Sequence, residues 1–121
     1  VNMHIYSKTV AIEGEVAASM ARTLIAPVAF RFLNELATTT AMVETGGNGI
    51  PGMTKLLAEV ASETDKLMES VKVLENAIGE GDSGMTIKGT AAVRGSVDNL
   101  ERLLPADRWP LPSYADMMFM M

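Results

Sequence analysis

The chain has 121 residues, of which 48% are apolar but only 5% aromatic, and its formal net charge is −5. This length suits one domain with a real core, which here must be built from Leu, Val, Ile, Met and Ala side chains. The negative charge and the lack of any basic run exclude nucleic-acid and anionic-membrane surfaces, because both need clustered Lys and Arg.

The sequence contains no cysteine, so disulfides and thiolate metal sites are excluded. No stretch resembles the roughly 18 consecutive apolar residues of a membrane span, and the N-terminal residues lack a signal-peptide pattern. We therefore expect a soluble, cytoplasmic protein that does not bind a membrane. Because the chain starts at Val1 rather than Met, it suggests an excised or processed piece.

A long first helix is predicted over about residues 7–43. Pro27 lies in its middle, where the ring removes one backbone hydrogen bond and clashes with the preceding turn, so we expect a kink rather than a break. A glycine-rich stretch, residues 44–52, follows the helix and ends it. The predicted stripe of this helix has four-residue steps and then three further apolar positions: Ile12, Val16, Met20, Leu24, Val28, Phe30, Leu33 and Leu36.

A second helix is predicted over about residues 51–78, with Leu56, Ala61 and Met68 widening its apolar stripe. Thr64 interrupts the seam, and its hydroxyl is expected to bond back to the preceding turn. Gly79 is the expected left-handed residue that closes the helix. Ion pairs on the solvated face are expected for Lys55–Glu59, Glu63–Lys66 and Glu69–Lys72. The seam alternates steps of four and three, typical of helices that pack together: Met53, Leu57, Val60, Thr64, Leu67, Val71, Leu74 and Ile78.

A third helix is predicted over about residues 84–104, with Asp82 or Ser83 as its N-cap and Pro105 marking its end. Gly89 and Gly95 each cost about 1 kcal/mol relative to Ala, so this helix needs its neighbours. Its seam has the same spacing as that of the second helix: Thr86, Thr90, Val93, Val97, Leu100 and Leu104.

The three predicted helices indicate an all-α fold. Because the connections between them are short, we expect an antiparallel three-helix bundle, whose first helix is too long for the other two to cover completely. The tail, residues 105–121, contains a Trp-Pro-Leu-Pro stretch at 109–112 that fixes extended backbone. The apolar end of the tail should dock on another surface. Docking on the bundle is favoured over docking on a partner. The candidate docking residues are Trp109, Leu111, Tyr114, Met118 and Phe119.

No complete active site can be assembled from these residues. His4 is the single histidine, so a triad has one conceivable base, and no Glu-x-x-His pair for a di-iron centre occurs. The glycine-rich segment 46–52 lacks the Gly-Lys-Ser/Thr ending of a phosphate loop and follows a helix, not a strand. We predict no catalytic, cofactor-binding or metal residue in this chain.

Residues 6–13 (YSKTVAIE), 20–22 (MAR), 25–27 (IAP) and 109–119 (WPLPSYADMMF) make up two segments that resemble the C-terminal region of type III glutamine synthetases. Residues 6–13 (YSKTVAIE), followed by 20–22 (MAR) and 25–27 (IAP), are similar to a pattern that leads into the family's long, proline-interrupted helix. Residues 109–119 (WPLPSYADMMF) look like its terminal Trp-Pro-x-Pro-x-Tyr signature.

The resemblance implies a parent enzyme that joins ammonia to glutamate with ATP and a divalent metal, in large rings of identical subunits. It also implies that the catalytic residues lie upstream, so this chain would be a non-catalytic assembly domain. Its partners would be the catalytic domain of the same parent and neighbouring subunits. Two alternatives are a free-standing helical interaction module and, less favoured, an enzyme with its own site in the bundle.

Overall fold

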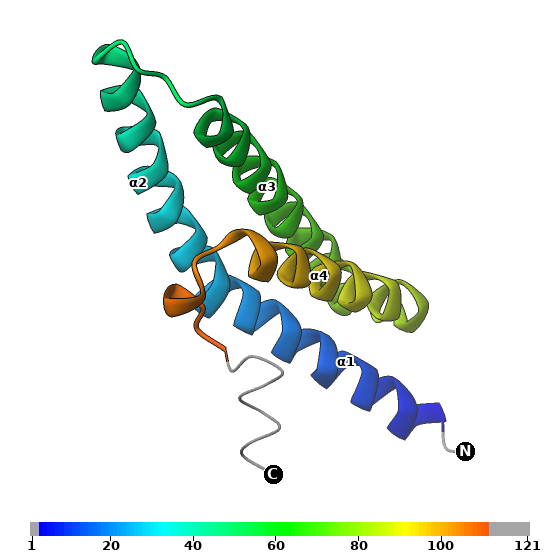
Figure 1. The fold of residues 1–121 in the computed structure, drawn as a ribbon. Helices are drawn as coiled ribbons and strands as arrows, with labels where there is room; N and C mark the ends of the chain where they lie inside the picture. Colours follow the sequence, from blue (N-terminus) through cyan, green and yellow to red (C-terminus); the bar gives the residue numbers. More distant parts are fainter. Residues whose placement is uncertain (1–2, 112–121) are drawn as a thin grey trace.

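The computed structural model describes residues 3–111 of the chain, and side chains from residue 6 (Figure 1). The predicted all-α class is confirmed for this part, in which every regular element is a helix. The elements are α1 (Met3–Met20), η1 (Ala21–Ile25), α2 (Ala26–Thr45), α3 (Pro51–Glu80), α4 (Ser83–Leu103) and η2 (Ala106–Arg108).

The first three elements form one uninterrupted helical stretch with a π-helical segment, η1, inside it. The Ala26 amide donates to the Ala21 carbonyl, five residues back, so the turn before Pro27 is wider than an α-helical turn. A wider turn relieves the contact between a proline ring and the preceding carbonyls. The sequence places the irregularity at Pro27, whereas the structure has it at residues 21–25. Figure 1 shows that α1 and α2 run in different directions.

The turn between α3 and α4 departs from the sequence prediction at one residue. Gly79 was expected to close α3, but it lies inside the helix, and Gly81 takes the left-handed conformation at φ 71°. The helix therefore continues for two more residues before a glycine is needed. Asp82 is the N-cap of α4, because its carboxylate accepts a hydrogen bond of 3.0 Å from the Met85 amide.

The core lies where the seams of α3 and α4 meet the inner face of α1 and η1. In α3 the middle of the predicted seam is buried, while Ala61, expected to widen the stripe, is exposed. In α4 the predicted seam is buried except at half-buried Val97. The fully buried side chains of the core come from η1, α3 and α4: Ile25, Val60, Leu67, Val71, Leu74, Val93 and Leu100.

Polar groups in the seams are satisfied within their own helices. The predicted back-bond of Thr64 is confirmed, with its hydroxyl donating to the Val60 carbonyl at 2.7 Å. Thr90 bonds to Thr86 in the same way at 2.8 Å. No described buried side-chain nitrogen or oxygen lacks a partner.

Glu63 is less exposed than the sequence pattern indicates. It forms the predicted pair with Lys66 at 4.0 Å, but its side chain is only 13% exposed. Its Oε1 accepts a hydrogen bond of 2.9 Å from Asn99 Nδ2 of α4. Glu63 therefore lies at the border between α3 and α4 rather than on a fully solvated face.

The two ends of the molecule differ in how many helices meet there. At one end α1, α3 and α4 lie together, whereas at the other α2 packs on the first part of α3 (Figure 1). We call the second region, residues 36–60, the two-helix arm. Buried side chains are sparse in it, being Leu36, Thr40 and Val60. Large apolar residues of the arm, Met42 (71% exposed) and Ile50 (51%), face outward.

Candidate functional site

The acidic residues that the structure describes do not gather into a metal site. Within the part of the chain that the structure describes, no group of three or more His, Asp or Glu side chains could hold a metal ion. His4 lies in the first turn of α1. Many of the exposed large apolar side chains lie on the first helix, among them Ile12, Val16 and Leu24.

The inner face of α1 and η1 consists mainly of small residues. Gly14, Ala18 and Ala21 are buried at spacings of four and three, followed by fully buried Ile25. A β-carbon on Gly14 would lie 3.0 Å from Thr86 Cγ2 and 3.1 Å from Ile78 Cδ1. These small residues allow α1 to approach α3 and α4 closely.

Several large apolar residues of the first helix consequently point elsewhere, so the predicted stripe is buried only in part, for example at Val28 and Leu36. Ile12 and Val16 are each 52% exposed and Leu24 is 40% exposed. The physical reason is the helical repeat of 3.6 residues, since positions four apart rotate by about 40° per step and cannot stay on one face. Phe30, also placed in the stripe, is 50% exposed because it lies two residues, or about 200° around the helix, from buried Val28.

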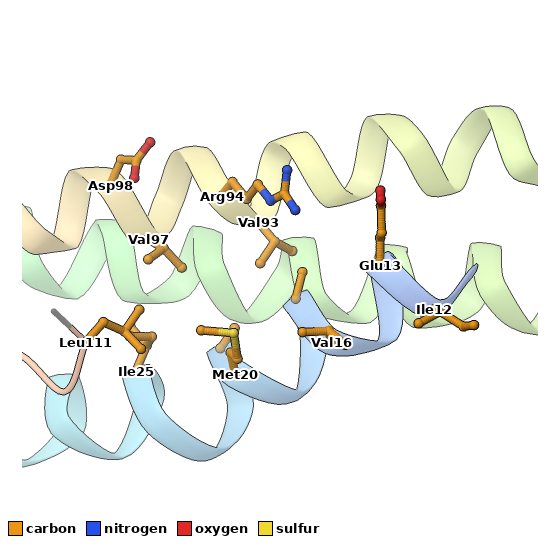
Figure 2. Close-up of a pocket in the computed structure, with 12 residues that line it drawn as sticks. Ile12, Glu13, Val16, Met20, Ile25, Val93, Arg94, Val97, Asp98 and Leu111 are labelled. Atoms are coloured by element: carbon orange, nitrogen blue, oxygen red, sulfur yellow. The ribbon is translucent and has the colours of Figure 1, made fainter. Parts of the chain in front are cut away.

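An apolar groove of about 390 Å³ runs between α1 and α4. We call it the α1–α4 groove, and Figure 2 shows its lining. Side chains of α1 and η1 form one wall and those of α4 the other, with Leu111 at the end near Ile25. Its apolar lining includes Ile12, Val16, Met20, Ile25, Val93 and Val97.

Three charged residues line the groove as well: Glu13, Arg94 and Asp98. Figure 2 shows the carboxylates of Glu13 and Asp98 pointing away from the row of apolar side chains. The groove therefore has an apolar floor and a charged rim, as ligand and segment-binding grooves commonly do.

The structure places two of the five predicted docking residues. Trp109 and Leu111 are half-buried and pack against the core cluster, and Leu111 also lines the α1–α4 groove. Tyr114, Met118 and Phe119 lie outside the described residues. Residues 106–108, just before the Trp-Pro-Leu-Pro stretch, form the 3-10 turn η2.

An ion pair fixes the position of that turn. The Arg108 guanidinium donates to the Glu35 carboxylate of α2, and this hydrogen bond raises the pKa of Arg108 above its ordinary value. A second pair, between Arg22 and Glu75, joins η1 to α3. The first pair holds the chain next to α2 just before it reaches the groove at Leu111.

One stretch of the described residues is long and apolar enough to cross a membrane by length and composition. It is the continuous helix Tyr6–Thr45, whose most apolar 18-residue window has a mean hydropathy of 1.4 and is 28% buried. The sequence prediction that nothing approaches a membrane span overlooked this window, because isolated charged residues interrupt each apolar run. Part of this helix, the face with Ala18, Ala21 and Ile25, packs on α3 and α4.

Sequence reasoning missed the groove because it assigned the large residues of α1 to the core. The available signal was the series of small residues, Gly14, Ala18 and Ala21, at helical spacing. Small residues aligned on one face indicate close helix approach there, and they leave the large residues for another contact.

Comparison with known proteins supports the resemblance noted in the sequence. The family model described as "Glutamine synthetase C-terminal domain" matches residues 1–44. This segment, which covers α1, η1 and nearly all of α2, is thus similar to the C-terminal domain of glutamine synthetases. No curated protein and no solved structure matches the chain.

Proposed function

We propose that the chain is the C-terminal helical region of a type III glutamine synthetase and that it serves subunit assembly rather than catalysis. The parent enzyme would join ammonia to glutamate with ATP and a divalent metal, in the cytoplasm. The observation that carries the proposal is the family match over residues 1–44, the segment whose outward face is most apolar.

The outward face of the first helix suits contacts with the rest of a larger protein. Leu24 and Phe30 are 40% and 50% exposed on η1 and α2, and large apolar side chains exposed on one helix favour burial against a partner. In the parent enzyme, the catalytic domain and neighbouring identical subunits would supply that partner. The net charge of −5 supports a protein partner over nucleic acid.

The type III assignment and the bundle form are parts of the same proposal. The Trp-Pro-Leu-Pro stretch at residues 109–112 and the proline-interrupted first helix support type III membership. An antiparallel three-helix bundle with a kinked first helix would be the form that this region adopts in solution.

The first test addresses catalysis. The isolated chain is assayed for ATP-dependent formation of glutamine from glutamate and ammonia with Mg²⁺. We expect no turnover above that of a heat-denatured sample. Measurable turnover would exclude a purely structural role.

The second test addresses assembly in the natural gene product. A reading frame that encodes a glutamine synthetase catalytic part upstream is required, whereas its absence would favour a free-standing interaction module. In that full-length protein, the double variant Leu24→Glu/Phe30→Glu should dissociate the assembly in sedimentation velocity. Thr38→Glu, at an exposed polar position of α2, is the matched control and should leave the assembly intact.

A further inference from the structure

The α1–α4 groove is open at the point where the described chain ends. Leu111, the last described residue, lines the groove and lies beside Ile25 (Figure 2). From there the groove continues along α1 to Ile12. The chain thus arrives at one end of an apolar channel with ten residues, 112–121, still to follow.

The chemistry of those ten residues matches the lining of the groove. All of the last five residues, 117–121, are Met or Phe. Met is flexible and fills irregular apolar surfaces, and the groove offers Ile, Val and Met side chains. Burying this segment would remove two apolar surfaces from water at once.

The segment is long enough to follow the groove. From Ile25 to Ile12 the helix rises about 20 Å at 1.5 Å per residue. From Leu111 to Met118 an extended chain covers about 23 Å at 3.3 Å per residue. Pro112 favours extended backbone at Leu111, which directs the chain onward rather than into a new helical turn.

We propose that residues 113–121 dock in the α1–α4 groove of their own chain, running antiparallel to α1 and covering Ile12, Val16 and Met20. The proposal does not depend on the proposed function. A second copy of the chain and a separate protein are the competing occupants, and the tests below distinguish them.

Disulfide trapping in the full chain provides the direct test, because the natural sequence has no cysteine to interfere. Met118→Cys is combined with Ile12→Cys in one protein and with Val16→Cys in another, both at exposed positions. The control combines Met118→Cys with Lys72→Cys, which is exposed on α3 and outside the groove. We expect at least one groove pair to cross-link within a single chain on the order of tenfold faster than the control, since docking raises the effective concentration.

Two results would overturn the proposal. Cross-linking of both groove pairs no faster than the control would show that the segment lies elsewhere. Products of twice the chain mass as the main species would assign the groove to a second copy.

A second measurement detects exposure of the groove without cysteines. In the full chain, Met118→Glu/Phe119→Glu should release the segment and increase the fluorescence of a bound apolar dye several-fold. Ser113→Glu is the control for added charge and should leave the fluorescence unchanged. Adding Val16→Glu to the double variant should lower the dye fluorescence again. Dye fluorescence of the double variant that stays as low as that of the unsubstituted chain would contradict docking.

Discussion

Gly89 of α4 lies so close to Leu74 of α3 that a β-carbon at residue 89 would come within 3.2 Å of the Leu74 Cα atom. The obstacle is the backbone of α3 as well as its side chain, so relief requires the two helices to separate. Gly95, two turns further along α4, has no such neighbour within 4 Å. The two glycines of α4 therefore have different roles, although their sequence contexts are similar.

Alanine at these two positions should change stability in opposite directions. Gly89→Ala should lower the free energy of unfolding by about 1–3 kcal/mol through overpacking, exceeding its gain in helix propensity. Gly95→Ala should raise it by about 0.5–1 kcal/mol, because an exposed helical glycine is unfavourable. Urea denaturation of both variants measures the difference. Equal stabilisation of the two would mean that α3 and α4 are further apart at residue 89.

A second glycine pair tests the end of α3. Gly81→Ala should cost about 1 kcal/mol because φ is 71° there, whereas Gly79→Ala, inside the helix and facing open space, should stabilise by about 0.5–1 kcal/mol. Thermal unfolding followed by circular dichroism compares them. The reverse order would place the left-handed residue at 79, as the sequence prediction had it.

The centre of the α3 seam should be sensitive to truncation. Leu67 is fully buried, so Leu67→Ala should cost about 2–5 kcal/mol through lost burial and a cavity. Val73→Ala, at a 42% exposed position of the same helix, is the control and should cost less than about 1 kcal/mol. A loss below 1 kcal/mol for Leu67→Ala would mean that this seam faces solvent.

The apolar helix Tyr6–Thr45 should not insert into a membrane. Arg22, the charged residue nearest the middle of this helix, would cost about 2.5–3.5 kcal/mol near the bilayer centre. Insertion would also break the pairs that Arg22 and Glu35 form with Glu75 and Arg108. After expression in bacteria, the chain should therefore remain in the supernatant when membranes are sedimented and carbonate-washed.

A matched variant controls that experiment. Arg22→Leu/Arg31→Leu/Glu35→Leu removes three charges from the helix and should shift the chain toward the membrane pellet. Recovery of the unsubstituted chain in the carbonate-resistant pellet would contradict the cytoplasmic proposal.

The sequence predicted α3 and α4 well because their seams are regular and consist of large side chains. In each helix two fully buried seam residues lie seven positions apart: Val60 and Leu67 in α3, and Val93 and Leu100 in α4. A pattern of this kind specifies one face of a helix regardless of which neighbour covers it. The sequence leaves Asp82 and Ser83 as alternative N-caps of α4. The structure shows that Asp82 is the N-cap, since its carboxylate accepts a hydrogen bond from the Met85 amide.

The first helix could not be predicted as well because both of its faces are apolar. Large residues such as Ile12 and Val16 suggest a core, but Gly14 and Ala18 occupy it. Which face turns inward depends on how closely α3 and α4 can approach, and that is a property of the packed helices. The groove was not predictable for the same reason, since four of its twelve lining residues come from α4.

The uneven pairing of helices has a consequence for how the molecule opens. Amide protons of the two-helix arm, shielded by a single neighbouring helix, should exchange with deuterated solvent sooner than those around Leu74 and Val93. Local opening would then start near residues 46–50 and stop at the end of the two-helix arm, where α1 and α4 also pack on α3. A ligand or subunit that clasps the arm could thereby stiffen one half of the protein while leaving the other half unchanged.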